Sequence, residues 1–266
     1  MDRRTDAVEL LDGPLDDPSA LAGNLRDLRR INRWLGGTSL TAPAIDALAA
    51  HRDELTLLDV GTGGADIPLA LLGRASRRSR RLSIVAIDHR PEVLAAAVRA
   101  TPAVATTHGL ELHVGDGRAL PYPDRSFDVA HASLLLHHLP AADSVGLLRE
   151  MARVARLGVV INDLERSRLG WLGAWLLGHV LTANRYTRHD APLSVSRAYR
   201  SDEMAAMLRE AGLTPVRTLR GAFGQRYAIA ALPTSGGSDD WGASDETDSV
   251  SPPGPPGPPD PRGAGE

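Results

Sequence analysis

The chain has 266 residues, a formal net charge of -3 and no cysteine. Without cysteine it can form no disulfide, no thiolate nucleophile and no cysteine-ligated zinc or iron–sulfur site. All 30 basic residues are arginine, which excludes a Schiff base on lysine and a Walker A loop. The small net charge argues against a nucleic-acid partner, because such proteins usually carry a strongly basic face. The first 18 residues lack the apolar stretch of a signal peptide, so a cytoplasmic location is the default expectation.

The N-terminal part predicts two helices. Between residues 18 and 35, apolar side chains recur every three or four positions, which is typical of one face of an amphipathic helix. Gly36 and Gly37 supply its expected end. A second helix is expected over residues 43–51, and we assign residues 1–54 to an N-terminal helical cap.

Strands and helices then alternate along the chain. Apolar, β-rich runs predict five strands, at residues 57–60, 82–88, 111–114, 127–136 and 157–163. Helical patterns fall at residues 67–73, 91–100 and 143–153. This alternation indicates crossover connections and a mostly parallel sheet. A helix over residues 201–211 with Ser201 as N-cap, and a hairpin of strands at residues 216–220 and 226–232, complete the pattern.

Two segments depart from the alternation. Residues 164–200 contain an apolar stretch, residues 171–181, which is shorter than the roughly 20 residues of a membrane span. We expect a buried or pocket-capping helix there, within a variable segment that covers the substrate. From residue 233 to residue 266 the chain is rich in Pro, Gly, Ser and Asp, so it is expected to form a disordered acidic tail that cannot bury enough apolar surface to become ordered.

The glycine-rich stretch LLDVGTGGAD, residues 57–66, is the first candidate binding motif. Gly61 and Gly63 let the backbone turn beneath a ligand because they carry no Cβ. A dinucleotide loop would need a glycine where Asp66 stands, and a carboxylate there would repel a pyrophosphate at the helix N-terminus. The stretch therefore favours a ligand that has an adenosine-like ribose but no phosphate.

Three acids follow the first three strands in order. Asp59 lies near the end of the first strand, Asp88 ends the second and Asp116 follows the third, before the fourth-strand segment FDVAHASLLLHHL. Together with the glycine stretch, these elements resemble the class I S-adenosylmethionine-dependent methyltransferases. The region VGDGRALPYPDRSFDVA resembles that of the ubiquinone/menaquinone-type and related small-molecule enzymes.

The resemblance covers residues 55–163 and, more weakly, residues 201–232. It implies an α/β fold: a Rossmann-like, mostly parallel seven-stranded sheet with helices on both faces and an antiparallel closing strand near the C-terminus. The chain departs from the family pattern at Gly64, where a threonine-like residue is common, and at Ala65, where a third glycine is usual.

The resemblance also implies S-adenosylmethionine as the cofactor. The residues assigned to it are Asp59, Gly61, Gly63, Asp88, Asp116, Gly117 and Ser133. Asp59 would help to hold the ammonium group, Asp88 would accept from the paired ribose hydroxyls, and Asp116 would accept from the adenine amino group. Taken singly, strand-end glycines can be turn formers, and Asp88 or Asp116 can be a helix cap or an Asx turn. Their occurrence together and in order favours binding.

Methyl transfer requires alignment and exclusion of water, and no metal is expected. A base would help where the acceptor is a phenol or an activated ring carbon. His137 and His138 are candidates because histidine titrates near neutral pH, and Asn162 at the end of the fifth strand is a third candidate. Alternatively, the two histidines only hydrogen-bond to loop backbone. A metal site that includes His131 lacks a recognisable ligand spacing.

The sequence therefore predicts methyl transfer to an O or C atom of a hydrophobic or aromatic small molecule, such as a phenol, a quinol or a polyketide-like compound. Trp171 and Trp175 would form an apolar wall for this acceptor, or else pack in the core. Two other classes stay open at this stage. One is an NAD-dependent Rossmann oxidoreductase, against which Asp66 speaks, and the other is a non-catalytic module that binds S-adenosylmethionine. Neither a nucleic-acid partner nor a membrane span is expected.

Overall fold

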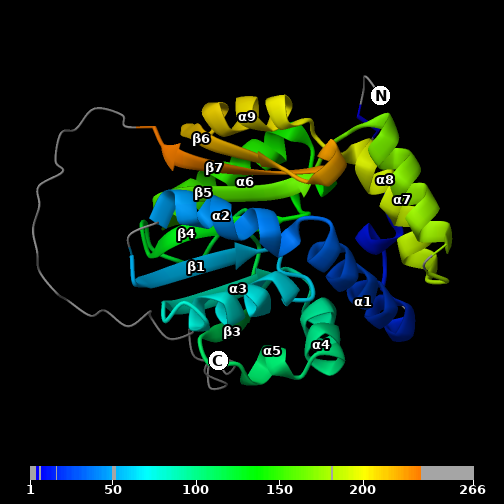
Figure 1. The fold of residues 1–266 in the computed structure, drawn as a ribbon, viewed down its shortest axis with the longest axis horizontal. Coiled ribbons are helices and arrows are strands. Elements are labelled where there is room, and N and C mark those ends of the chain that lie inside the picture. Colours follow the sequence, from blue (N-terminus) through cyan, green and yellow to red (C-terminus); the bar gives the residue numbers. More distant parts are fainter. Residues whose placement is uncertain (1–3, 6, 16, 50–51, 181, 235–266) are drawn as a thin grey trace, which may run out of the picture. The chain divides into compact units, whose positions relative to one another are not determined.

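Seven strands form one sheet with the order β3-β2-β1-β4-β5-β7-β6 (Figure 1). The strands are β1 (Glu54–Val60), β2 (Arg81–Asp88), β3 (Leu110–Val114), β4 (Phe127–Ser133), β5 (Ala155–Leu164), β6 (Leu213–Arg220) and β7 (Arg226–Pro233). β1 to β5 pair in parallel, whereas β7 is antiparallel to both β5 and β6. The expected fold class is confirmed.

The computed structural model describes residues 4–5, 7–15, 17–49, 52–180 and 182–234, so nearly all of the expected acidic tail lies outside it. The described helices are α1 (Pro18–Trp34), α2 (Gly37–Ala49), α3 (Asp66–Ser76), α4 (Pro91–Ala100), α5 (Ala103–Thr106), α6 (Ala141–Val154), α7 (Arg168–Val180), α8 (Arg185–Arg197) and α9 (Ser201–Glu210). Three short 3₁₀ turns are η1 (Leu10–Asp12), η2 (Leu136–His138) and η3 (Ala222–Gly224). None of the described helices has both the length and the apolar character needed to cross a bilayer.

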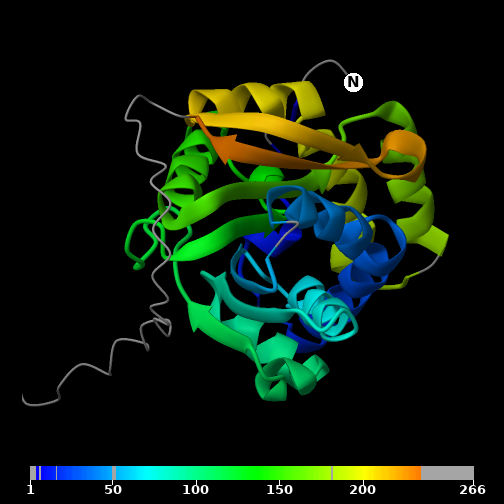
Figure 2. The same cartoon turned by 60° about the vertical axis from the view of Figure 1, so that its left-hand side comes forward.

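Helices cover both faces of the sheet (Figures 1 and 2). In β1, Leu57 packs in a core shared with α2 and α3, whereas its neighbour Leu58 packs in a core shared with α6 and α9. Successive side chains of a strand point to opposite faces, and both leucines are fully buried. Burial on both faces explains why the parallel strands read as continuous apolar runs in the sequence.

Some expected boundaries are wrong for identifiable reasons. The second helix begins at Gly37, with Pro43 inside it, because Gly36 turns the chain in the left-handed region with φ +101°. The fourth strand ends at Ser133, because Leu134 has φ +53° and η2 follows. Arg200, and not Ser201, is the N-cap of α9.

The cap of α9 is held by a side chain from its own first turn. The Arg200 backbone N–H donates to Glu203 Oε2 over 2.8 Å. This contact satisfies a backbone donor at the start of the helix. Ser201 is therefore the first helical residue.

Residues 164–200 contain two helices, α7 and α8, that pack on each other. The expectation of a buried helix over residues 171–181 is wrong for the large side chains, since Trp171 and Leu176 are exposed. The reason is that α7 turns its small residues toward α8. A Cβ at Gly170 would lie 3.5 Å from Val195, and one at Gly178 would lie 3.4 Å from the α8 backbone.

Gly158 permits the close approach of β7 to β5. Its φ is +148°, and a Cβ at this position would overlap the carbonyl oxygen of Ala231.

We expect Gly158→Ala to lower the free energy of unfolding by more than about 2 kcal/mol, measured by urea denaturation. Gly146→Ala is the matched control, because a Cβ on this α6 glycine would meet no atom within 4 Å. It should stabilise the protein by roughly 0.5–1 kcal/mol. Equal stability of Gly158→Ala and wild type would contradict this account.

Candidate active site

The glycine loop after β1 lies at the carboxyl edge of the parallel strands, where α/β sheets bind ligands. Gly61 and Gly63 adopt left-handed conformations, with φ +69° and +53°. A Cβ on Gly61 would lie 2.8 Å from the Leu135 side chain, whereas a Cβ on Gly63 would meet no atom within 4 Å. Gly61 is therefore needed for packing, and Gly63 borders open space that can admit a ligand.

Asp88 connects the end of β2 to this loop. Its Oδ2 accepts from the Gly63 backbone N–H and its Oδ1 accepts from the Arg90 backbone N–H, each over 3.0 Å. Each carboxylate oxygen can accept more than one hydrogen bond, so Asp88 retains capacity for hydroxyl donors. The hydroxyl of Thr62 in the same loop is buried and has no hydrogen-bond partner. These residues fit a ligand with polar groups at the loop.

Ala65 and Asp66 begin α3. Ala65, where the family usually has glycine, is the N-cap and has φ +51° and ψ +25°. This left-handed conformation favours glycine, which gives the family preference a physical reason. Asp66 Oδ1 accepts from Asn32 Nδ2 on α1 over 3.3 Å. Burial raises the pKa of Asp66 and outweighs this hydrogen bond.

Asp116 and Gly117 follow β3. The Asp116 carboxylate is half-exposed and takes hydrogen bonds from Arg118 Nε at 3.1 Å and Nη2 at 2.9 Å. Hydrogen bonds from the Arg118 side chain and backbone lower the pKa of Asp116. A Cβ on Gly117 would lie 2.6 Å from Val60 and 2.9 Å from Leu147, so this glycine lets the loop pack against β1 and α6.

Asp59 has a different environment from the other expected cofactor residues. It is buried, and its Oδ1 lies 2.5 Å from Nδ1 of His131 on β4. The other ring nitrogen of His131 lies 3.2 Å from Oγ1 of Thr41 on α2, and Thr41 Oγ1 accepts from Asn162 Nδ2 over 2.8 Å. Asp59 therefore begins a buried polar chain that runs across the sheet to β5.

This polar chain ends at Arg226, the first residue of β7. The guanidinium is fully buried and donates to Asn162 Oδ1 at 2.5 Å, Asn32 Oδ1 at 2.8 Å and Ser133 Oγ at 2.7 Å. The sequence analysis did not single out Arg226 or Asn32. The available signal was an arginine at the head of the otherwise apolar run RYAIAAL.

Asn162 is fully engaged within the fold. Its two amide hydrogens have three acceptors in range: Thr41 Oγ1 and the carbonyl oxygens of Gly36 and Gly37, at 2.8 to 3.0 Å. Its oxygen accepts from Arg226. We therefore expect Asn162 to hold the junction between α1 and α2 against the sheet. We do not expect it to contact a methyl acceptor.

His137 and Asp163 form a buried pair. His137 Nδ1 lies 2.7 Å from Asp163 Oδ1, and the backbone N–H of Leu164 donates to the same oxygen over 2.8 Å. Burial favours a raised pKa for Asp163, but the charge and hydrogen bond of His137 outweigh it, so the pKa lies below its ordinary value. An ionised carboxylate only accepts, so Nδ1 carries a hydrogen, and in the neutral form of the ring the lone pair is then on Nε2. This is the geometry of a base oriented by an acid.

The N-terminal residues Glu9 and Asp12 lie over the two histidines. Glu9 Oε1 is 3.9 Å from His137 Nε2, and Glu9 Oε2 is 3.9 Å from His138 Nδ1. Asp12 Oδ1 lies 2.8 Å from His138 Nδ1, and Arg197 bonds both Asp12 and the His138 carbonyl. Burial raises the pKa of Glu9 to about 7, with His138 opposing the shift. His138 is thus tied to the N-terminal segment, which leaves His137 as the better-placed base. No local sequence pattern predicts that Glu9 lies beside these two histidines, and only the tertiary fold places it there.

Among the described residues, Glu9, His137 and His138 have ligand atoms within 4.8 Å of one another, as a metal site would require. However, Arg197 Nη1 lies only 3.6 Å from Glu9 Oε1, and its positive charge opposes a second cation. The absence of a metal from the reaction stays a prediction.

Comparison with known proteins relates the chain to methyltransferases. Residues 58–161 match a family model described as a methyltransferase domain. The chain is 31% identical over 195 residues to the ubiquinone/menaquinone biosynthesis C-methyltransferase UbiE of Dinoroseobacter shibae, across 69% of this chain and 74% of that protein. It is 26% identical over 172 residues to the UbiE protein of Rickettsia akari, across 60% of this chain and 68% of that protein.

A solved structure of a SAM-dependent methyltransferase from Aquifex aeolicus has the same fold. The TM-score is 0.57 at 18% identity, and the match covers 82% of this chain and 98% of that one. At this identity the likeness speaks for the fold alone. The sequence relatives are methyltransferases by name and do not favour the oxidoreductase alternative. From the sequence match to these relatives and the shared fold, we conclude that the chain belongs to the class I S-adenosylmethionine-dependent methyltransferases.

Proposed function

We propose that this methyltransferase acts on an O or C atom of a hydrophobic or aromatic small molecule with an ionisable hydroxyl, such as a phenol or quinol, and that His137 is its base. The observation that carries the proposal is the buried 2.7 Å pair of His137 and Asp163. It follows β4, which pairs with the β1 strand that leads into the glycine loop. The names of the UbiE relatives, which refer to quinone biosynthesis, support a quinol-like acceptor.

S-adenosylmethionine, when bound, supplies a methyl group that its sulfonium centre activates for in-line displacement. We assign Gly63 and Asp88 to its recognition, because Gly63 borders open space and each Asp88 oxygen, which already accepts one backbone N–H, can accept a further hydrogen bond from a ribose hydroxyl. Asp116 can also bind the cofactor only if its oxygens accept hydrogen bonds from the cofactor and from Arg118 at the same time. Asp59 acts indirectly, by fixing His131 and the strand ends beneath the loop.

The protein's part in the transfer is to orient the acceptor, exclude water and accept a proton. The lone pair on His137 Nε2 takes the proton of the acceptor hydroxyl as the new bond to the methyl group forms. Asp163 holds the ring in the correct tautomer and stabilises the imidazolium that results. The same proton transfer activates either the oxygen or the conjugated ring carbon of a phenol or quinol.

Access to His137 requires movement of the N-terminal segment. Glu9 faces Nε2 and both side chains are buried. The acceptor can reach Nε2 only when residues 9–12 move aside. We therefore assign this segment to acceptor entry as well as to water exclusion.

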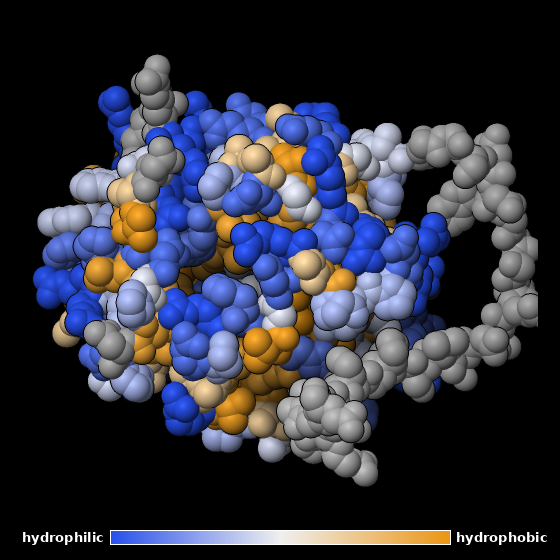
Figure 3. All heavy atoms as spheres, turned by 180° about the vertical axis from the view of Figure 1, so that it is seen from behind, coloured by the Kyte–Doolittle hydropathy of each residue, from blue (hydrophilic) through white to orange (hydrophobic). Residues whose placement is uncertain are grey.

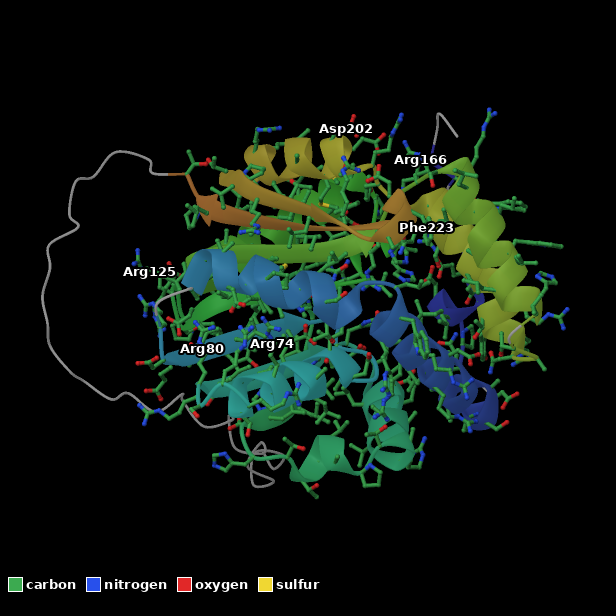
Figure 4. All side chains as sticks on the ribbon, viewed as in Figure 1. Arg74, Arg80, Arg125, Arg166, Asp202 and Phe223 are labelled. Atoms are coloured by element: carbon green, nitrogen blue, oxygen red, sulfur yellow. The ribbon has the colours of Figure 1, made fainter. Side chains whose placement is uncertain are left out.

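Asp88→Ala should weaken binding of S-adenosylmethionine by about 1–3 kcal/mol, or roughly 5- to 150-fold, because hydrogen bonds to a charged group are lost. Isothermal titration calorimetry measures this loss. The matched control is Asp202→Ala, which removes an exposed carboxylate on α9 (Figure 4) and should leave the affinity unchanged. Equal affinity of Asp88→Ala and wild type would remove Asp88 from the cofactor site, and tighter binding of NAD than of S-adenosylmethionine would refute the cofactor assignment.

His137→Gln should lower kcat for a quinol or phenol acceptor by about 10²- to 10⁴-fold while leaving cofactor affinity nearly unchanged, because a general base contributes to the transition state. His138→Gln is the neighbouring control and should have a much smaller effect. A wild-type kcat in His137→Gln would exclude His137 as the base.

Glu9→Gln should stabilise the protein at pH 8 and have little effect near pH 4. The pKa of Glu9 rises from 4.5 to about 7 on folding, so the folded state binds this proton more tightly and stability falls as pH rises between these values. At pH 8 the substitution should raise the free energy of unfolding by at most about 3 kcal/mol, because it removes the cost of a buried negative charge. Urea denaturation at both pH values measures it, with the exposed Glu210→Gln as control. A pH-independent effect of Glu9→Gln would contradict the burial argument.

A further inference from the structure

α7 exposes large apolar side chains that an amphipathic helix normally buries. Its small residues, Gly170 and Gly178, face α8, and its large apolar residues face outward. The outward residues Leu169, Leu172, Trp175, Leu176 and Val180 are between 41% and 79% exposed. Helices that contribute to a water-surrounded fold normally bury such side chains. Figure 3 shows the molecule from behind, where apolar side chains lie among hydrophilic ones.

The surroundings of α7 are basic. Residues 166–189 contain four arginines and no acid. Of these, Arg168 is exposed in the first turn of α7, and Arg185 and Arg188 are exposed in the first turn of α8, just beyond the other end of α7. The apolar face is therefore flanked by positive charge at both ends.

A groove of about 590 Å³ lies beside the C-terminal end of α7. It is formed by α1 and residues 182–185, and its cationic members are Arg26, Arg30 and Arg185. Asp17 and Asp27 also line it, and Asp27 Oδ1 accepts from Arg30 over 3.3 Å. Arg185 Nη2 also lies 3.9 Å from Asp17 Oδ2, so two of the three arginines are ion-paired and the groove carries little net charge.

We propose that α7, with the exposed arginines at its two ends, docks the protein on the surface of a bilayer that contains anionic phospholipid. An apolar stripe with tryptophan and flanking arginines suits the boundary between headgroups and acyl chains. At 13 residues, α7 is about 20 Å long and lies on the bilayer without crossing it. The proposal goes beyond the methyl-transfer function and does not depend on it.

Pairing with a second copy of the chain suits this surface less well. Antiparallel pairing of two α7 helices would bring Arg168 of one copy near Arg185 and Arg188 of the other. Like charges facing each other across an interface destabilise it. Anionic lipid instead complements the same arginines.

The test is co-sedimentation of the full chain with vesicles of phosphatidylcholine, with and without phosphatidylglycerol. We expect binding that is stronger with phosphatidylglycerol and weaker at high salt, with a blue shift of tryptophan fluorescence. Leu176→Glu should lower vesicle affinity at least about tenfold. Val216→Glu is the matched control, because Leu176 is 52% exposed and Val216, on β6, is 49% exposed. This control should bind as wild type.

A second variant separates the charges from the apolar face. Arg168→Gln with Arg188→Gln should remove the preference for phosphatidylglycerol, and both substitutions are at exposed positions that should not affect folding. Light scattering coupled to size exclusion reports the oligomeric state. Absence of vesicle binding, equal binding by Leu176→Glu, or a dimer that Leu176→Glu dissociates would each overturn the proposal.

Discussion

The buried guanidinium of Arg226 is the contact on which the arrangement of the candidate site depends. It joins β7 to β5 through Asn162, to β4 through Ser133 and to α1 through Asn32. Burial lowers its pKa to about 10, while Asp163 and Asp66 oppose the shift, so the group stays charged at neutral pH. An unpaired buried charge costs several kcal/mol, and here three neutral acceptors and the field of two carboxylates offset that cost.

The same guanidinium forms one end of the polar chain that crosses the sheet. Asp59, His131, Thr41 and Asn162 contact one another in succession from β1 to β5, and Arg226 closes the chain. Buried polar groups are tolerated when each has a partner, and a fully connected network restricts the structure to one arrangement. The strand ends that carry the glycine loop and His137 are therefore held in register with the helices that cover them.

The N-terminal segment combines two opposing requirements. Under the proposed function, it must exclude water from His137 during transfer, and it must admit an acceptor of some size. Glu9 suits a segment with both tasks, because its buried carboxyl makes no strong ion pair: His137, His138 and Arg197 lie at 3.6 to 3.9 Å. Other contacts hold the segment in place: the backbone N–H groups of Leu10 and Leu11 donate to the Asp190 carboxylate over 2.8 and 3.0 Å, and Asp12 contacts His138 and Arg197.

The sequence alone determined the α/β class, the order of the elements, and the loop and acids that identify the family, because these depend on local patterns: hydrophobic period, glycine positions and strand ends. The resemblance to the family, carried by these motifs in order, assigned Gly63 and Asp88 to one cofactor site. Only the tertiary structure decided which polar residues share a hydrogen bond. Arg226 and Asn32 are 194 positions apart, and no local pattern predicts that contact. The same holds for Glu9 over His137, and for α7, where packing against α8 through glycines turned an apolar helix outward.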